Sequence, residues 1–459
     1  MSTIAAISSA PANGGIGIIR ISGKDCFKIL EKIFIPKQKQ NIDEIPGYTI
    51  KYGHIIDLKT KEKIDEVLVS FFKEPKSYTT ENMCEINSHG GVVVEQKILE
   101  QCLLAGANMA EPGEFTKRAF LNGRIDLSQA EGIIDLINAK TDLEAKASFK
   151  QLEGGLSNKI KEIRKDILDM LADIEASIDY PEYDDIPEIT NKKVIEQIIK
   201  IKEKLKKLEK SFDSGKVLKE GIRTVILGKP NVGKSSLLNA ILKEDRAIVS
   251  QIEGTTRDTI EEMVQIHGIP LKLIDTAGIR NAKDEIEQIG VNKALKISEE
   301  ADLILCIFDN SQELEEEDIK ILNIIKNKNA IILLNKTDIK ECKLEENEKI
   351  KSTNKPIIKI SAKTKTGIEE VYKQIENMFR INEININNGE IITNIRHKNQ
   401  IIKAINTMDE AIKSIKINMP IDIIAVSIKD ALEELSVITG ENVSEDILNN
   451  IFSKFCLGK

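Results

Sequence analysis

A glycine-rich octapeptide, Gly-Lys-Pro-Asn-Val-Gly-Lys-Ser, occupies residues 228–235. Its glycines permit a tight turn, and the backbone N–H groups of such a turn before a helix bind phosphate oxygens. Lys234 supplies a cation for the β- and γ-phosphates of a nucleotide, and the hydroxyl of Ser235 suits magnesium. The octapeptide therefore predicts a nucleotide phosphate site.

Three further motifs follow in the order found in guanine-nucleotide-binding proteins: Gly254-Thr255-Thr256, Asp275-Thr276-Ala277-Gly278 and Asn335-Lys336-Thr337-Asp338. Thr256 is the expected switch threonine over magnesium, and Asp275 the water-mediated second anchor. The N–H of Gly278 suits the γ-phosphate. The carboxylate of Asp338 can accept from the ring N–H and the exocyclic amine of guanine, a pattern that adenine lacks. We expect the chain to bind and hydrolyse GTP.

The expected GTP-binding residues come from these motifs, from the segment before Gly254 and from a Ser-Ala pair whose backbone fits the guanine oxygen. They are Asn231, Val232, Gly233, Lys234, Ser235, Ser236, Ser250, Gln251, Ile252, Glu253, Gly254, Thr255, Thr256, Asp275, Thr276, Ala277, Gly278, Asn335, Lys336, Asp338, Ser361 and Ala362. The expected magnesium ligands are Ser235 and Thr256.

The residue after the third motif departs from Ras-like proteins, which carry a water-orienting glutamine there. Ile279 cannot orient water, so another group must do so, and another charge must meet the developing negative charge. The carbonyl oxygen of Asn231 suits a monovalent cation, although an asparagine here could also simply cap the loop. Glu285 and Glu287 follow, and a carboxylate there could reach the attacking water through a bridging water, although exposed glutamates are usually only solvated. The expected potassium ligands are Asn231, Ser250, Ile252 and Thr255.

Hydrophobic patterns divide the chain into four segments. Short strand-like runs around a helical stretch are typical of a mixed α/β or α+β domain, and apolar residues at three- and four-residue spacing indicate amphipathic helices, one of them over 193–212. Buried strand-like runs alternating with helices around the octapeptide predict a doubly wound α/β unit. In chain order, we assign a mixed domain to 1–118, helices to 119–217, the nucleotide-binding unit to 218–379 and helices again to 380–459.

The two helical segments are either unrelated or halves of one domain that receives the nucleotide-binding unit as an insertion. We favour insertion, because it succeeds at exposed loops whose ends are close.

Length and composition restrict the class of protein. A chain of 459 residues exceeds the roughly 250–300 residues of one hydrophobic core, so several domains are expected. The net charge of −8 argues against a surface that generally coats DNA or RNA, although it allows a local basic patch. No apolar run approaches the ~20 residues that span a bilayer, and the first residues lack a basic signal-peptide head. We expect a cytoplasmic protein without a membrane partner.

Family landmarks extend well beyond the nucleotide motifs. They are residues 10–23, 77–81 with Glu85, 89–91, 111–123, 126–131, 174–179 and the terminal Phe-Cys-Leu-Gly-Lys at 455–459. On these segments the whole chain resembles the MnmE (TrmE) family of tRNA-modification GTPases, within the TrmE-Era-EngA-like group. The terminal pentapeptide is a highly specific part of this resemblance.

The resemblance implies a multidomain α/β protein with three parts. An N-terminal α+β domain binds folate and dimerises the chain, and a discontinuous all-α domain carries an inserted Ras-like P-loop GTPase domain. The GTPase domains are expected to pair with potassium at their interface, and Glu287 is expected to position the attacking water. With an FAD-containing partner, MnmG (GidA), members of the family add an aminomethyl or carboxymethylaminomethyl group to C5 of the tRNA wobble uridine.

The folate residues implied by the resemblance are Arg20, Glu85, Arg124 and Lys459, for 5-formyl- or 5,10-methylene-tetrahydrofolate. Cations suit the glutamate tail of folate, and a carboxylate suits the pterin N–H edge. The family often has lysine at the position of Arg124, which preserves the charge but changes the donor geometry. Cys456 is not in a prenylation box, and the resemblance leaves it either a catalytic or a structural role.

Three alternatives remain at the level of sequence. A ribosome-assembly GTPase of the Era or Der type shares the asparagine-containing loop, but it leaves residues 1–118 unexplained. A nucleotide-gated scaffold would use those residues only to dimerise, and tetrahydrofolate binding would separate it from an enzyme of one-carbon chemistry. A folate aminomethyltransferase regulated by GTP would act without the flavin partner.

Overall fold

The computed structural model divides into two compact units. The residues it describes are 1–179, 191–244, 262–266, 268–274, 298–299, 301–339, 343–379 and 391–459. Unit one comprises Met1–Ile134, Leu152–Lys161 and Leu432–Lys459, and unit two comprises Asp135–Gln151 and Glu162–Ala431.

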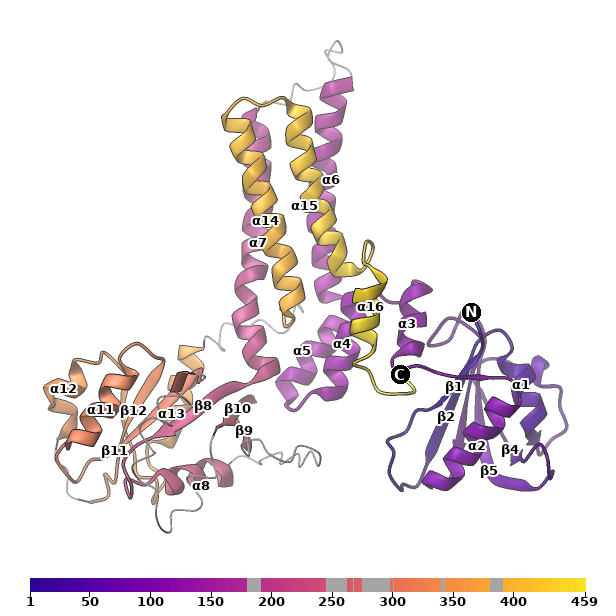
Figure 1. Ribbon diagram of the computed structural model, residues 1–459, viewed down its shortest axis with the longest axis horizontal. Coiled ribbons are helices and arrows are strands. Elements are labelled where there is room, and N and C mark those ends of the chain that lie inside the picture. Colours follow the sequence, from indigo (N-terminus) through magenta and orange to yellow (C-terminus); the bar gives the residue numbers. More distant parts are fainter. Residues whose placement is uncertain are drawn as a thin grey trace. The chain divides into compact units, whose positions relative to one another are not determined.

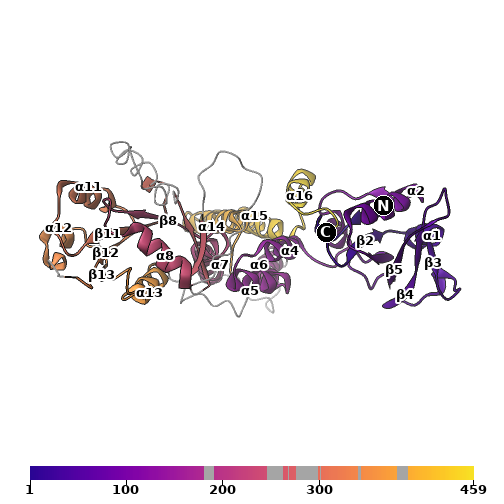
Figure 2. The same cartoon turned by 90° about the horizontal axis from the view of Figure 1, so that it is seen from below.

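Unit one is built on a seven-stranded sheet with the strand order β3-β4-β5-β6-β2-β1-β7 (Figure 1). The strands are β1 (Ile4–Ile7), β2 (Gly17–Ser22), β3 (Phe34–Pro36), β4 (Thr49–Ile56), β5 (Lys63–Phe72), β6 (Met83–Ser88) and β7 (Asn108–Met109). Neighbouring strands pair antiparallel, except that β1 and β7 run parallel. Helices α1 (Cys26–Ile33) and α2 (Val92–Leu104) lie on one face of this sheet (Figures 1 and 2).

The two faces of β2 differ in chemistry because successive side chains of a strand point to opposite sides. Ile19 and Ile21 are fully buried in the core that α1 and α2 cover. Arg20, between them, lies on the other face and stands opposite Glu85 of β6 in the antiparallel register. The strand pattern therefore delivers an arginine and a glutamate, side by side, to the face without the two helices.

A small helical cluster completes unit one and receives the C-terminus. It contains α3 (Glu114–Leu121), the first part of α4 (Leu127–Asn138) and α16 (Glu445–Phe452). Their buried apolar side chains include Ala119, Leu127, Phe452 and Phe455. Gly113, just before α3, has φ 69°, and a Cβ there would lie 2.6 Å from the Phe452 carbonyl oxygen. A glycine is thus needed where the C-terminal helix passes.

Long helices in unit two come from both sides of the nucleotide-binding unit. They are the greater part of α6 (Gly155–Asp179), from Glu162 on, and α7 (Asn191–Glu220) before it, and α14 (Ile395–Lys416) and the part of α15 (Ile421–Thr439) up to Ala431 after it; the shorter α5 (Asp142–Leu152) precedes α6. Helix α14 lies along α7 (Figure 1), with the ammonium of Lys398 4.5 Å from the centre of the Phe212 ring. Segments far apart in sequence therefore form one helical body, as the insertion hypothesis expects.

The nucleotide-binding unit is a six-stranded sheet with the order β13-β12-β11-β8-β10-β9. Its strands are β8 (Ile222–Leu227), β9 (Glu262–Ile266), β10 (Ile269–Leu273), β11 (Leu303–Asp309), β12 (Ala330–Asn335) and β13 (Ile357–Lys359). All pair in parallel except β9, which runs antiparallel to β10. Buried side chains of α8 (Lys234–Glu244) and α13 (Ile368–Met378) pack with one face, and those of α11 (Glu316–Ile325) and α12 (Glu348–Lys351) with the other.

These features confirm the expected α/β multidomain fold class. One element differs in length, because α7 extends from Asn191 to Glu220 whereas the hydrophobic pattern predicted 193–212. Residues 211–215, Ser-Phe-Asp-Ser-Gly, are poor helix formers. Gly215 nevertheless packs so closely on the Ile392 carbonyl that a Cβ would overlap it, and this tertiary contact sustains the helix.

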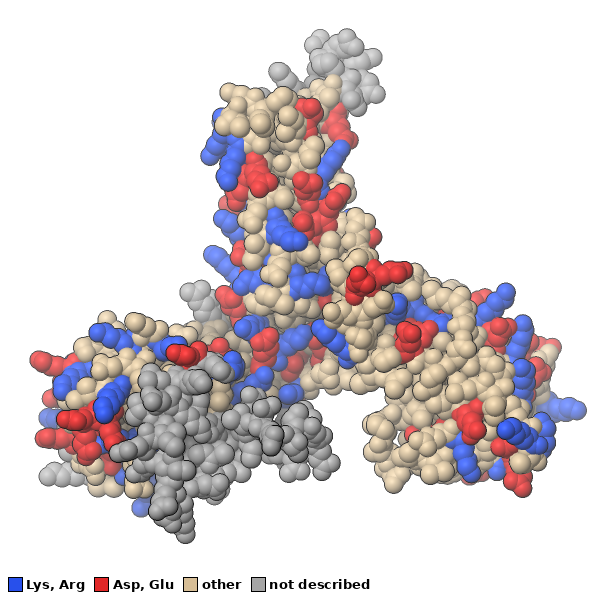
Figure 3. All heavy atoms as spheres, viewed as in Figure 1, with Lys and Arg blue, Asp and Glu red and all other residues tan. Residues whose placement is uncertain are grey.

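None of the helices in the described part of the chain combines the length and the hydropathy needed to span a bilayer. In the view of Figure 3, basic and acidic side chains are intermingled over the surface.

Candidate functional site

The phosphate loop connects β8 to α8 and adopts a conformation that requires its glycines. A Cβ on Gly228 would lie 2.5 Å from the Ile307 carbonyl oxygen, and one on Gly233 would overlap the side-chain amide of Asn335. Gly233 has φ 106°, and Asn231 is also left-handed with φ 61°. The close approach of β11 and of the Asn335 amide thus explains both glycines of the octapeptide.

Lys234 begins α8, and its ammonium lies within the loop. Nζ donates to the carbonyl oxygens of Gly228 and Lys229, each at 2.6 Å. Ser235 and Ser236 follow in the first turn of the helix, where backbone N–H groups have no intrahelical acceptor. A cation, two hydroxyls and a helix N-terminus are thus gathered at the carboxyl end of β8.

Asn335, at the end of β12, joins the phosphate loop to the base-recognition segment. Its Nδ2 donates to the Val232 carbonyl at 2.7 Å, and its Oδ1 accepts from the Ala362 N–H at 2.9 Å. The hydroxyl of Ser361 donates to Oδ1 of Asp338 at 2.7 Å. This hydrogen bond is the main reason why the pKa of Asp338 lies below its ordinary value. The structure therefore brings the first, fourth and Ser-Ala motifs together.

Asp309 is a residue of this site that the sequence did not single out. It ends β11, and its Oδ2 accepts from Lys336 Nζ at 2.6 Å while Oδ1 accepts from the Ser311 hydroxyl at 2.6 Å. Burial alone would raise the pKa of Asp309, but these hydrogen bonds from Lys336 and Ser311 lower it. An aspartate at the end of a wholly buried strand was the available signal.

The remaining expected nucleotide, magnesium, potassium and water-positioning residues lie outside the described residues. They are Ser250, Gln251, Ile252, Glu253, Gly254, Thr255, Thr256, Asp275, Thr276, Ala277, Gly278, Glu285 and Glu287.

A second polar site lies on the face of the unit-one sheet opposite α1 and α2. Arg20 donates to Oε1 of Glu85 through Nε at 3.0 Å and through Nη2 at 2.8 Å. Its Nη1 donates to the Gly458 carbonyl at 2.9 Å. Oε2 of Glu85 accepts no hydrogen bond from the described residues. The C-terminal tail is thus attached to the sheet beside a carboxylate that keeps a free oxygen.

Tyr78 lies between two of the expected folate residues. The guanidinium carbon of Arg20 is 5.4 Å from the centre of its ring, and that of Arg124 is 4.6 Å away. The Tyr78 hydroxyl forms a 2.8 Å hydrogen bond with Thr116. Arg124 has no ion pair with a carboxylate in the described part of the chain, and it borders a hollow of ≈ 510 Å³. Tyr78 lies within the family landmark at residues 77–81, but its position in the sequence did not predict that it would lie between Arg20 and Arg124.

The C-terminal tail is fixed by close contact with β1. Gly458 has φ 83° and leaves no room for a Cβ beside the Ile7 carbonyl, and the Ser8 hydroxyl donates to its oxygen at 3.0 Å. Burial, followed by the charge of Arg20, lowers the pKa of Lys459. Cys456 is exposed. The tail therefore brings Lys459 to Arg20 and Glu85, and the four expected folate residues share one region.

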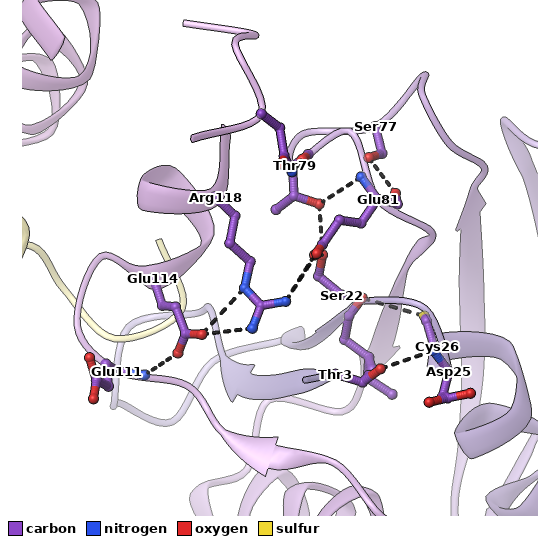
Figure 4. A network of polar contacts seen from close by, with 12 residues as sticks. Thr3, Ser22, Asp25, Cys26, Ser77, Thr79, Glu81, Glu111, Glu114 and Arg118 are labelled. Carbon is purple, nitrogen blue, oxygen red and sulfur yellow. Dashed lines mark hydrogen bonds and ion pairs between the residues drawn. The ribbon is translucent and has the colours of Figure 1, made fainter. Parts of the chain in front are cut away.

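A buried arginine braces the neighbouring loop (Figure 4). Arg118 of α3 pairs with Glu81 at 3.0 Å and with Glu114 at 2.7 Å, and Glu81 also accepts from the Ser22 hydroxyl at 2.8 Å. Because the arginine is only 3% exposed, these pairs are shielded from solvent. These ion pairs hold the segment that carries Tyr78, so Arg118 stabilises a loop that borders the second site.

Family models and relatives match the parts of the chain that contain both sites. A model described as "GTP-binding protein TrmE N-terminus" matches residues 3–124, and one described as "MnmE helical domain" matches residues 127–456. A protein named tRNA modification GTPase MnmE from Acetivibrio thermocellus is 51% identical over 458 residues, covering 100% of this chain and 99% of the relative. The proteins of the same name from Clostridioides difficile and Thermoanaerobacter pseudethanolicus are 50% and 49% identical with the same coverage.

The chain belongs to the MnmE family.

Membership in the MnmE family confirms the resemblance found in the sequence and makes the chain an enzyme of the tRNA modification GTPase class. The MnmE match also extends over residues 1–118, which the hypothesis of a ribosome-assembly GTPase leaves unexplained.

Proposed function

We propose that this chain is a homodimeric, potassium-dependent GTPase of tRNA modification. With the FAD-containing partner MnmG (GidA), it adds an aminomethyl or carboxymethylaminomethyl group to C5 of the wobble uridine. The one-carbon unit comes from 5-formyl- or 5,10-methylene-tetrahydrofolate. The observation that carries the proposal is the meeting of Arg20, Glu85, Arg124 and Lys459 in a protein whose other unit holds the guanine-nucleotide motifs.

In the nucleotide site, GTP is the substrate and each described motif has a distinct role. Lys234 neutralises the β- and γ-phosphates, and Ser235 ligates magnesium together with Thr256. Asp338 accepts from guanine in its ionised form, which the hydrogen bond from Ser361 favours by lowering the pKa of the carboxyl. Asn335 holds the Val232 carbonyl and the Ala362 N–H, so the phosphate and base contacts keep a fixed separation.

Hydrolysis is proposed to use potassium and a glutamate instead of an arginine finger. Asn231, an exposed residue of the phosphate loop with a left-handed backbone, contributes to the potassium site with Ser250, Ile252 and Thr255. Glu287 orients the attacking water. A cation in this position would offset the negative charge that develops during phosphoryl transfer.

The donor set of the second site fits a folate. Arg124, with no carboxylate partner among the described residues, and Lys459 supply positive charge for the glutamate tail. The free Oε2 of Glu85 suits the amine and ring N–H of a pterin. Bound there, the folate would supply the one-carbon unit. Cys456, which is exposed on the adjacent tail, is a further candidate for a role in this chemistry.

These roles follow a proposed division of the chain. Residues 1–118 bind folate and dimerise, 119–217 and 380–459 form the helical domain, and 218–379 form the GTPase domain. Because charges of both signs intermingle in Figure 3, we propose that this protein shares contact with tRNA with its flavin partner. Tight and strongly salt-dependent tRNA binding by this chain alone would contradict that part.

Equilibrium binding of 5-formyl-tetrahydrofolate tests the proposal. We expect binding by the intact chain, and a loss of affinity of about ten-fold or more for Arg124→Ala, because a charge-assisted contact is lost. Lys28→Ala is the matched control, since that lysine is 69% exposed and lies on α1 at the other face of the sheet. Equal affinity in all three proteins, or no binding at all, would contradict the folate assignment.

A further inference from the structure

Lys229, the second residue of the octapeptide, faces away from the loop toward α11. Its Nζ lies 2.8 Å from Oδ2 of Asp318 and 3.1 Å from Oε2 of Glu315. The lysine side chain is 11% exposed and that of Asp318 is 4% exposed, whereas that of Glu315 is 65% exposed. A basic side chain from the phosphate loop is therefore enclosed at the start of α11, and Asp318 is the buried partner.

The backbone of Lys229 contacts the nucleotide machinery directly. Its carbonyl oxygen accepts from Nζ of Lys234 at 2.6 Å. Two residues later, Asn231 has φ 61°, a left-handed conformation that asparagine tolerates better than most residues other than glycine. A side chain that fixes the first turn of the loop would therefore determine where Lys234 and Asn231 lie.

We propose that Lys229 is a positioning residue for GTP binding and hydrolysis. Its contacts with Asp318 and Glu315 fix the phosphate loop to α11. This clamp maintains the carbonyl contact to Lys234 and the left-handed turn at Asn231. The proposal rests on the assignment of residues 228–235 as the phosphate site, and it adds a function to a position that is not among the expected GTP-binding residues.

The carboxylate of Asp318 has a second oxygen that can still accept a hydrogen bond, and this oxygen provides a test of the clamp. Oδ2 of Asp318 already accepts from Lys229 and from the Glu315 N–H at 3.0 Å. Oδ1 of Asp318 is buried and has no hydrogen-bond partner. Lysine offers a single charged point, whereas arginine offers two parallel N–H groups that match both oxygens of a carboxylate. Arginine at position 229 should therefore retain the clamp.

The test measures the Kd of a fluorescent GDP analogue and the KM and kcat for GTP, with melting temperature as a control for folding. For Lys229→Met we expect Kd and KM to rise about ten-fold, since a charge-assisted contact is removed. Lys229→Arg should stay within about two-fold of the wild type. Lys320 is an exposed lysine on α11, and Lys320→Met should leave Kd, KM, kcat and the melting temperature unchanged.

Substitution of the buried acid, Asp318, should weaken nucleotide binding more than substitution of the exposed acid, Glu315. Asp318→Asn retains an acceptor for the Glu315 N–H but loses the charge, so its effect should approach that of Lys229→Met; Glu315→Gln should raise Kd about two-fold. Unchanged nucleotide affinity in a folded Lys229→Met protein, or no restoration by arginine, would overturn the proposal. If Lys229→Met does not fold, Asp318→Asn decides: a Kd raised well beyond two-fold supports the clamp, and a Kd within two-fold of the wild type overturns it. Absence of binding by the wild type would instead refute the phosphate-site assignment.

Discussion

At the scale of single residues, the chemistry of the nucleotide site was largely readable from the sequence. The octapeptide and the Asn-Lys-Thr-Asp motif predicted Lys234, Asn335 and Asp338 as site residues, because each motif requires fixed residue types at a fixed spacing. The acidic partners of the neighbouring lysines were not readable. Asp309 lies 27 residues before its partner Lys336, Asp318 of α11 lies far from its partner Lys229 in sequence, and only the fold brings each pair together.

Loss of the Glu287 carboxylate should separate binding from hydrolysis. We expect Glu287→Ala to bind GTP as the wild type does, since no binding contact is assigned to it, and to lower kcat by about 100-fold or more. Single-turnover hydrolysis and nucleotide titration check this. Glu285→Ala serves as the neighbouring control, and unchanged turnover of Glu287→Ala would refute its role in positioning water.

The pH dependence of folate affinity should report Lys459. Burial and Arg20 lower the pKa of this lysine, so its charged form is present at low pH and is lost as the pH rises through that lowered value. Affinity for an anionic folate should therefore fall with rising pH before an ordinary lysine would titrate. Lys459→Gln should bind more weakly at neutral pH and show a flatter profile; an identical profile in both proteins would exclude Lys459 from the site.

At the scale of elements, strand and helix positions followed from hydrophobic periodicity, but tertiary contacts set some of their ends. The buried strand-like runs predicted around the octapeptide match β8 and its neighbours in the sheet, whereas α7 is longer than the predicted 193–212. Its last turns are sustained by packing of Gly215 on the chain that returns from the nucleotide-binding unit. No local pattern could have shown this contact, because Ile392 is distant in sequence.

Substitution of Gly215 by alanine has two opposing effects on stability: it raises helix propensity and it disturbs the packing on Ile392. Alanine should stabilise a helix interior by about 1 kcal/mol relative to glycine. A Cβ here overlaps the Ile392 carbonyl, and we expect this strain to outweigh the gain and to leave a net loss of about 1–3 kcal/mol. Thermal unfolding of Gly215→Ala measures the balance, with Ser214→Ala as the adjacent control. A higher melting temperature for Gly215→Ala would show that the packing is loose.

At the scale of the whole molecule, the terminal pentapeptide indicated the family, but its place in the fold came only from the structure. Arg20 contacts the Gly458 carbonyl across 438 positions of sequence. Residue types alone could not show that the sheet, the Tyr78 loop and the tail assemble one polar site. The proposed activity needs that site and the GTPase site in one chain, since hydrolysis is proposed to drive the folate-dependent step.

The most direct test is a reconstituted reaction with this protein, its flavin partner, tRNA, folate and GTP in matched potassium and sodium buffers. Phosphate release and modified wobble uridine, detected by mass spectrometry, are followed together. We predict fast GTP turnover and C5-modified uridine in potassium, and little of either in sodium. Equal turnover in the two salts would contradict the potassium mechanism, and equal product without GTP hydrolysis would contradict the proposal that hydrolysis drives the modification.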